Sequence, residues 1–195
     1  ISKVNTHILS ITTKDALKVD IKTYCHSIEP YVSILGYKLY IVSNKDVFDS
    51  EWLANVNHKL STPLQEQSFV FVRQPTANLL PHQDLFPPER GFIYGLNYIL
   101  DGSNDTFMTY YKPDYEHAYP LTRYPSGPII ETEKVVVPTD NLLLINTTAY
   151  HSVTVGSSER WCMSLRPLDS IYEKGAPMTW DQVQKNYKSL ILNEK

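Results

Sequence analysis

Two stretches in the first sixty residues carry apolar residues at helical spacing. The first places Leu17, Ile21, Tyr24 and Ile28 on one face, and the second places Phe48, Trp52, Val56 and Leu60. Intervals of three and four residues predict amphipathic helices. Thr12 and Asp15 have the spacing of a capping box before the first helix, and Pro30 and Pro63 close the two segments.

The pattern changes at Ser68, where short runs rich in β-branched and aromatic residues alternate with turn residues. Counting the stretch 78–84, eight such runs fall within about 100 residues, which is the strand spacing of a sandwich, a barrel or a jelly roll. The other seven runs are 69–72, 91–100, 106–112, 129–137, 142–146, 152–155 and 161–166. With further strands predicted at 7–11 and 38–43, they indicate a mainly β protein whose helices flank one face of the β unit.

The end of the chain predicts one more helix. Thr179 and Gln182 have the spacing of a capping box, and an apolar stripe follows at Trp180, Val183, Tyr187 and Leu190. No repeat or shift in composition divides the chain, so we expect a single domain over residues 1–195. Within it, residues 1–67 supply supporting helices and strands, 68–167 form the β core, and 168–195 carry the C-terminal helix.

One connection is too long for its place in a compact domain. The segment 113–128 is rich in proline and contains Tyr115, Tyr119 and Tyr124. Loops of this length often serve as lids or binding loops. A surface excursion whose tyrosines cover core residues is an equally good interpretation, and the sequence does not choose between the two.

Composition and charge exclude several classes of protein. Hydrophobic residues make up 42% of the 195 residues and charged residues 20%, which excludes disordered and fibrous chains. The net charge of −3 and the lack of a basic stripe argue against a nucleic-acid partner. No apolar run approaches the ~20 residues of a membrane helix, and Cys25 and Cys162 are too few for a disulfide framework. We therefore expect a cytoplasmic protein acting on a small molecule or a peptide, of unknown oligomeric state.

Three residues carry the strongest chemical signal. His82 and Asp84 are two positions apart, so an extended chain directs both side chains to one face. His151 opens the predicted strand 151–155. Two histidines and one carboxylate form the facial metal site of non-haem Fe(II) oxygenases, which leaves coordination positions open for substrate and O₂. The sequence therefore predicts a metal site at His82, Asp84 and His151.

A nearby arginine extends this prediction to a ligand. Arg160 lies nine positions after His151, on the next predicted strand. Strand alternation directs Arg160, Ser164 and Arg166 to one face, and hence into one cavity. A fixed guanidinium there would bind the far carboxylate of a dicarboxylate whose near end chelates the metal. Arg166 is a competing anchor, and we prefer Arg160.

At these positions the chain resembles the Fe(II)/2-oxoglutarate-dependent oxygenases. The resemblance rests on His82-Gln-Asp84, on His151-Ser-Val and on Arg160, and it covers roughly residues 68–167. It implies a double-stranded β-helix, a cupin-like jelly roll of eight strands, in which the triad binds Fe(II). It also implies that Arg160 anchors 2-oxoglutarate, with help from Tyr98, fourteen positions after Asp84.

The same resemblance implies an activity. Such enzymes use O₂ and 2-oxoglutarate to hydroxylate a C–H bond, and they release succinate and CO₂. Residues 95–100 and 106–110 are similar to strands of the prolyl and aspartyl/asparaginyl hydroxylases, which implies a peptide or amino-acid-like substrate. The chain departs from the family at 140–141, where Asp-Asn replaces a glycine, and at Cys162, where some members carry serine.

Other classes of protein remain open on the sequence alone. A jelly roll with this triad also suits a cupin-type isomerase, a Zn²⁺ hydrolase or a binding module without catalysis. Arg160 discriminates among them, because isomerases and hydrolases have no need of a dicarboxylate anchor beside the metal.

Overall fold

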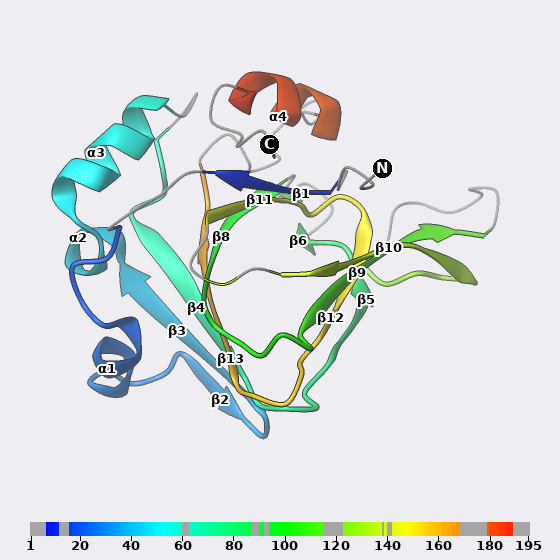
Figure 1. Ribbon diagram of the computed structural model, residues 1–195, viewed down its shortest axis with the longest axis horizontal. Coiled ribbons are helices and arrows are strands. Elements are labelled where there is room, and N and C mark those ends of the chain that lie inside the picture. Colours follow the sequence, from blue (N-terminus) through cyan, green and yellow to red (C-terminus); the bar gives the residue numbers. More distant parts are fainter. Residues whose placement is uncertain are drawn as a thin grey trace.

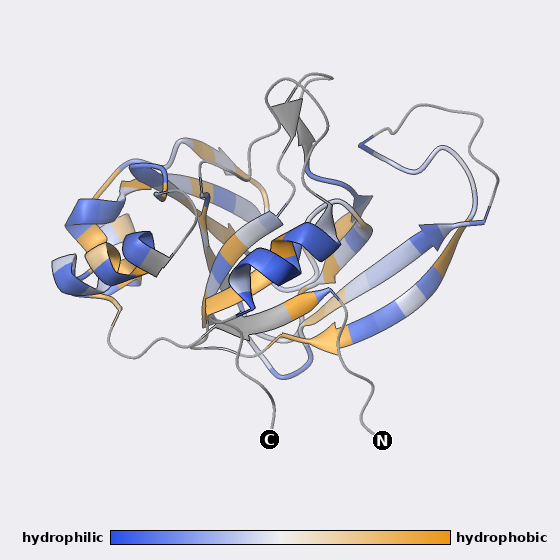
Figure 2. Ribbon diagram, turned by 90° about the horizontal axis from the view of Figure 1, so that it is seen from above, coloured by the Kyte–Doolittle hydropathy of each residue, from blue (hydrophilic) through white to orange (hydrophobic). Residues whose placement is uncertain are grey.

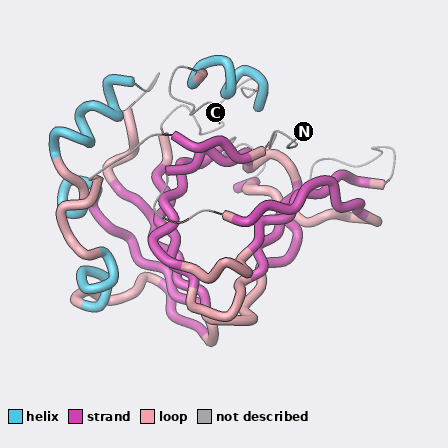
Figure 3. The backbone as a smooth tube through the Cα atoms, in the orientation of Figure 1, coloured by secondary structure: helices cyan, strands magenta, loops and turns pink. Residues whose placement is uncertain are grey.

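The computed structural model describes residues 7–11, 16–59, 63–86, 90–91, 94–114, 123–137, 139, 142–167 and 179–188. Within them, two antiparallel sheets face each other (Figures 1 and 3). The larger sheet contains, in spatial order, β1 (Ile8–Ile11), β11 (Leu142–Asn146), β8 (Tyr94–Asp101), β13 (Arg160–Leu165), β4 (Gln67–Arg73), β3 (Tyr37–Ser43) and β2 (Val32–Ile34). The smaller sheet contains β10 (Ile129–Val136), β9 (Phe107–Pro113), β12 (Tyr150–Thr154) and β5 (Leu79–His82), and a separate ribbon pairs β6 (Leu85–Phe86) with β7 (Arg90–Gly91).

The path of the chain between the sheets defines a double-stranded β-helix. After β4 in the larger sheet the chain enters the smaller sheet as β5, returns as β8, and crosses again as β9 and β10. It then returns as β11, crosses as β12, and ends the core in the larger sheet as β13. The eight strands thus wind between two facing sheets, with a single step, from β9 to β10, that stays within the smaller sheet, as in a jelly roll. The predicted mainly β fold, a cupin-like double-stranded β-helix with flanking helices, is confirmed.

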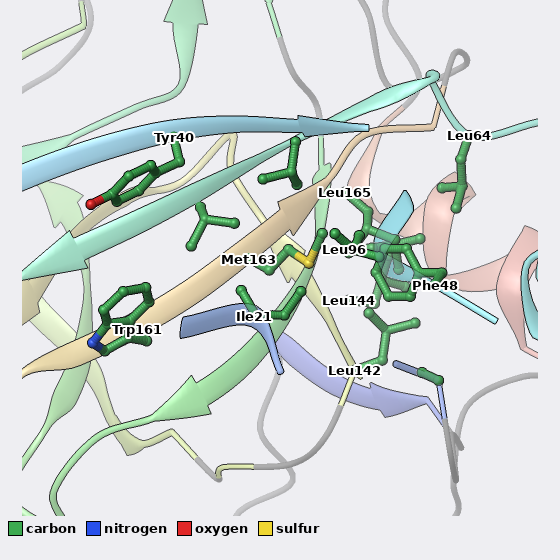
Figure 4. Close-up of a cluster of buried hydrophobic side chains, with 14 of the residues drawn as sticks. Ile21, Tyr40, Phe48, Leu64, Leu96, Leu142, Leu144, Trp161, Met163 and Leu165 are labelled. Carbon is green, nitrogen blue, oxygen red and sulfur yellow. The ribbon is translucent and has the colours of Figure 1, made fainter. Parts of the chain in front are cut away.

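The two faces of the larger sheet belong to different hydrophobic clusters. One cluster lies between the two sheets and comprises Ile8, Ile99, Met108, Tyr110, Val137, Leu143, Ile145 and Cys162. The other joins the opposite face of the larger sheet to the helices and includes Val70, Leu96, Leu144, Trp161 and Met163 (Figure 4). Because successive strand residues point to opposite faces, Trp161 and Met163 face the helices while Cys162 faces the smaller sheet. This alternation decides which residues can reach a site between the sheets.

In the described part of the chain, four helices cover the larger sheet on its outer side. They are α1 (Ile21–His26), α2 (Asn44–Val47), α3 (Ser50–Lys59) and α4 (Trp180–Tyr187). Ile21, Cys25, Val47, Val183 and Tyr187 are buried in the same cluster as the sheet residues. Figure 2 shows hydrophilic and hydrophobic residues alternating along the helices, as expected for amphipathic helices that cover a sheet on one side. Among the described helices, none combines the length and apolar character that a membrane crossing requires.

The predicted first helix is shorter in the structure than its apolar spacing indicates. α1 begins after Asp20, whose side chain accepts a hydrogen bond of 2.7 Å from the Thr23 N–H. Leu17 therefore lies before the helix, where it forms an isolated β-bridge with Phe48. The cap predicted at Thr12 and Asp15 lies outside the described residues.

The predicted second helix is divided in two. Phe48 is the C-cap of α2 and has an extended backbone. Asp49 then accepts a hydrogen bond of 2.9 Å from the Trp52 N–H at the start of α3. Apolar spacing alone does not reveal this break. Phe48 before it and Trp52 after it both pack in the helix-side cluster, so the apolar pattern continues without interruption. The predicted capping box at Thr179 and Gln182 is confirmed at the start of α4, whereas Leu190, the last residue of the predicted stripe, lies outside the described residues.

Candidate metal centre

The three predicted metal ligands come together at one end of the smaller sheet. His151 on β12 is the register partner of His82 at the end of β5. The Asp84 N–H donates to the carbonyl oxygen of Thr147 at 3.2 Å, which fixes the carboxylate beside the two rings. One ligand atom from each of the three residues lies within 4.8 Å of the other two. The structure thus assembles the triad from two strands and the turn that follows one of them.

Hydrogen bonds determine which nitrogen of each imidazole is available. Nδ1 of His82 lies 2.8 Å from the carbonyl oxygen of Leu80, and Nδ1 of His151 lies 2.9 Å from that of Ala149. Because a carbonyl oxygen only accepts, each Nδ1 donates its proton, which leaves Nε2 with a lone pair. Metal-binding histidines are commonly oriented in this way. The residues therefore fit a divalent transition metal, with two neutral imidazoles and one carboxylate as donors.

Burial and charge keep His151 and Asp84 in the protonation states that a metal requires. Burial lowers the pKa of His151 to about 4, although the nearby charge of Asp84 opposes the shift. For Asp84, burial would raise the pKa, but the contact with His82 and the charge of Arg166 outweigh it and hold that pKa well below its usual range. At neutral pH His151 is neutral and Asp84 is ionised, so neither needs to lose a proton before binding a metal.

Arg166 lies directly against the triad. Its Nη2 donates to Oδ2 of Asp84 at 3.1 Å, and its Nη1 donates to the carbonyl oxygen of Tyr94 at 3.3 Å. The sequence left Arg166 and Arg160 as competing anchors for a dicarboxylate. The structure gives Arg166 a different neighbour, the Asp84 carboxylate of the candidate triad.

Arg160 lies at the opposite end of β13, where its charge has no carboxylate partner among the described residues. The residue is only 5% exposed, and its buried Nε has no hydrogen-bond partner there. Its register partner on β4 is another arginine, Arg73. Burial, together with the charge of Arg160, lowers the pKa of Arg73, while Tyr37 raises it. Two positive charges therefore lie side by side on β13 and β4, at the end of β13 opposite Arg166.

Two polar side chains lie between these ends. Ser164 shares a strand face with Arg160 and Cys162, and its register partner on β8 is Asn97. The Ser164 Oγ and the Asn97 Oδ1 are buried, and neither has a hydrogen-bond partner among the described residues. Buried polar atoms are normally satisfied, so this strip fits a polar ligand between the sheets.

Tyr98 does not join the other predicted site residues. It is the register partner of Leu142 and Met163 and packs against the helix-side cluster. Its position fourteen residues after Asp84 matches the oxygenases in spacing, but spacing along a chain does not determine the face of a strand. The structure gives no support to a ligand role for Tyr98.

The long connection 113–128 is described at its two ends only. The Gln83 N–H donates to the carbonyl oxygen of Arg123 at 2.8 Å, so the second end lies against the residue between His82 and Asp84. Residues 115–122 fall outside the described part of the chain.

No protein-family model matches the chain, and no curated protein matches its sequence. Solved structures with a similar backbone include a 2OG-Fe(II) oxygenase-family oxidoreductase from Burkholderia pseudomallei, at 9% identity and a TM-score of 0.49 over 80% of this chain and 78% of that one. HygX from Streptomyces hygroscopicus, solved with nickel, 2-oxoglutarate and hygromycin B, matches at 14% identity and a TM-score of 0.45 over 76% and 77%.

The similar structures also include proteins of other kinds. Vicilin from hazelnut matches at 8% identity and a TM-score of 0.42 over 73% of this chain, which spans about a third, 32%, of the vicilin. The oxygenases and the vicilin thus match this chain at similarly low sequence identity. Only the chemistry of the site itself therefore bears on function.

Proposed function

We propose that the protein is an Fe(II)- and 2-oxoglutarate-dependent dioxygenase that hydroxylates a C–H bond of a peptide or amino-acid-like substrate. One atom of O₂ would enter the substrate as a hydroxyl group, and the other would enter succinate as 2-oxoglutarate loses CO₂. Iron bound by the triad would supply the oxidising chemistry. The chain itself would hold the metal, bind the co-substrate and exclude water.

The observation that carries this proposal is the buried, unpaired charge of Arg160. Burying a guanidinium without a counter-charge costs several kcal/mol, and within the described residues no carboxylate offsets this cost. A chain gains from such a charge when an anion binds it. A metal triad at one end of the interior and a guanidinium at the other fit a ligand that chelates a metal through one end and carries a carboxylate at its other end.

Each polar residue of the interior has a part in this proposal. Nε2 of His82, Nε2 of His151 and Oδ1 of Asp84 would hold the iron. The Arg160 guanidinium would bind the distal carboxylate, and the Ser164 hydroxyl would donate a hydrogen bond to the same ligand. The apolar residues between the sheets, including Ile99 and Leu143, would exclude water and so strengthen these polar contacts.

The test needs no knowledge of the substrate. Fe(II) and 2-oxoglutarate are added under argon, and the visible charge-transfer band of the chelate is titrated in wild type, Arg160→Gln and His151→Ala. We expect the band in wild type, its loss in His151→Ala, and binding weakened about 30-fold or more in Arg160→Gln, because a buried charge pair contributes at least about 2 kcal/mol. The exposed Lys38→Gln variant removes a positive charge elsewhere and should bind as wild type does.

A second ligand separates the anchor from the chelate. 2-Oxobutanoate has the metal-chelating end of 2-oxoglutarate but no distal carboxylate. It should bind wild type and Arg160→Gln equally weakly. Iron bound without a band in wild type would reject the dioxygenase proposal and favour a cupin-type isomerase, a hydrolase or a binding module.

A further inference from the structure

Two hydrogen bonds, one from each terminal nitrogen, hold the guanidinium of Arg166 in place. Its side chain is 9% exposed, and its two terminal nitrogens donate to two different acceptors, Oδ2 of Asp84 and the Tyr94 carbonyl. The first acceptor belongs to the triad, and the second to the backbone of β8. The guanidinium therefore connects the metal-ligating carboxylate to the larger sheet, whereas both histidines lie on the smaller sheet.

Gly95 creates the space that this guanidinium occupies. A Cβ atom at residue 95 would lie 2.5 Å from Nη1 of Arg166 and 3.1 Å from its Cζ. Real Cβ atoms do not come within 2.5 Å of another heavy atom, so any other residue at position 95 would displace the end of the arginine side chain. The close approach of Arg166 to the β8 backbone thus depends on a glycine.

The two oxygens of Asp84 are consequently different. Oδ2 is occupied by the Arg166 hydrogen bond, whereas Oδ1 faces the His82 ring, 3.5 Å from its Nε2. We propose that Arg166 is a positioning residue that restricts Asp84 to one metal-binding oxygen and orients that oxygen beside the two imidazoles. This inference rests on the metal centre proposed above.

Two effects of opposite sign meet at Arg166. Its positive charge repels a bound cation, which alone would make its removal strengthen metal binding. Its hydrogen bond orients the carboxylate, and loss of such outer hydrogen bonds typically costs 10–100-fold in metal affinity. The geometry points to orientation as the larger effect, because the arginine is fixed by two hydrogen bonds and by the glycine behind it.

Cobalt(II) tests this inference without iron, oxygen or a co-substrate. Its affinity is measured by titration, and its visible absorption spectrum reports the number and arrangement of ligand atoms. We expect Arg166→Gln to weaken Co²⁺ binding about 10–100-fold and to change the spectrum, because a released carboxylate can bind through both oxygens. Arg166→Lys keeps the charge and one donor and should restore part of the affinity.

Two further variants provide controls. Gly95→Ala leaves every charge in place but displaces the guanidinium, so it should change affinity and spectrum in the same direction as Arg166→Gln. Arg73→Gln removes an arginine from the far end of the interior and should leave both unchanged. Circular dichroism establishes that each variant is folded, and Gly95→Ala and Arg166→Lys carry the test if Arg166→Gln does not fold.

Each outcome has a distinct meaning. Wild type that binds Co²⁺ through the triad, with Arg166 variants of equal or higher affinity and unchanged spectrum, would overturn the positioning role and leave the metal centre intact. If wild type does not bind Co²⁺, or if His151→Ala binds it as tightly as wild type does, the metal centre and this inference are overturned together.

Discussion

The thiol of Cys25 is completely shielded from solvent by the hydrophobic core. The residue lies on the buried face of α1 and is fully buried, and burial raises the pKa of its thiol to about 11. A thiol must be deprotonated and accessible to react. Cys25 therefore serves as an apolar core residue and not as a reactive group.

This burial makes Cys25 a reporter of unfolding. We expect Ellman's reagent at pH 8 to modify Cys25 at least about 1000-fold more slowly in the native protein than in urea, because reaction requires the rare unfolded state. The Cys162→Ala variant isolates the thiol for this measurement. Fast modification of the native protein would show that α1 opens independently of the rest of the core.

The residues of the site differ in how far the sequence could predict them. The sequence reveals the triad of His82, Asp84 and His151 because two histidines and a carboxylate at this spacing are typical of a facial metal site. The contact between Arg166 and Asp84 leaves no local signal, since it joins residues 82 positions apart in the chain. Tyr98 shows the converse, since its spacing is right but the alternation of β8 turns it towards the helices.

At the level of elements, α4 docks through one aromatic residue in particular. Tyr187 is fully buried, its ring lies 5.4 Å from that of Tyr94 on β8, and the two hydroxyl groups are hydrogen-bonded. Val183, one turn earlier, is also fully buried. The helix thus contributes its stripe to the core of the larger sheet.

Truncation of Tyr187 should be costly for this reason. Removing a large buried aromatic side chain typically costs about 3–5 kcal/mol, so we expect Tyr187→Ala to lower the free energy of unfolding by that amount in urea. Tyr31 is 71% exposed, and Tyr31→Ala should change it by no more than about 0.5 kcal/mol. Equal effects of the two variants would mean that α4 adds little to stability.

The boundaries of the elements were predictable only where a local signal marks them. The capping box of α4 is such a signal, and the structure shows it. The break at Phe48 and Asp49 has no such mark, because the buried stripe continues across it. The short strands β2, β6 and β7 were not predicted, since two or three residues are too few to show alternation.

For the whole molecule, the buried His151 makes stability depend on pH. The unfolded chain binds a proton on this residue near pH 6.5, whereas the folded chain does so only near pH 4. Between these values the unfolded state binds more protons, so stability falls as the pH is lowered. Asp84, whose pKa is also lowered by folding, adds to this loss in stronger acid.

Urea unfolding at a series of pH values checks this expectation. For wild type without metal, the free energy of unfolding should fall by an amount on the order of 3 kcal/mol between pH 6.5 and pH 4 because of His151 alone. His151→Gln should show a clearly smaller fall, and the exposed His58→Gln should behave as wild type. An unchanged slope in His151→Gln would contradict the assigned burial of a neutral imidazole.

The overall architecture was the most predictable level of all. Eight short strands separated by turns leave few arrangements that bury two faces of a sheet, and the jelly roll is one of them. The pairing of strands from distant parts of the chain, such as β4 with β13, could not be read from local pattern. It follows from the order in which the chain crosses between the two sheets.

The buried charge of Arg160, which has no carboxylate partner among the described residues, has a consequence for the amount of folded protein. An anion that binds only the native state stabilises it in proportion to the logarithm of its concentration once the site is nearly saturated. Chains without the anion would spend more time unfolded, where proteases degrade them. The cellular level of this protein would then rise and fall with the supply of its own small-molecule ligand, without any dedicated regulator.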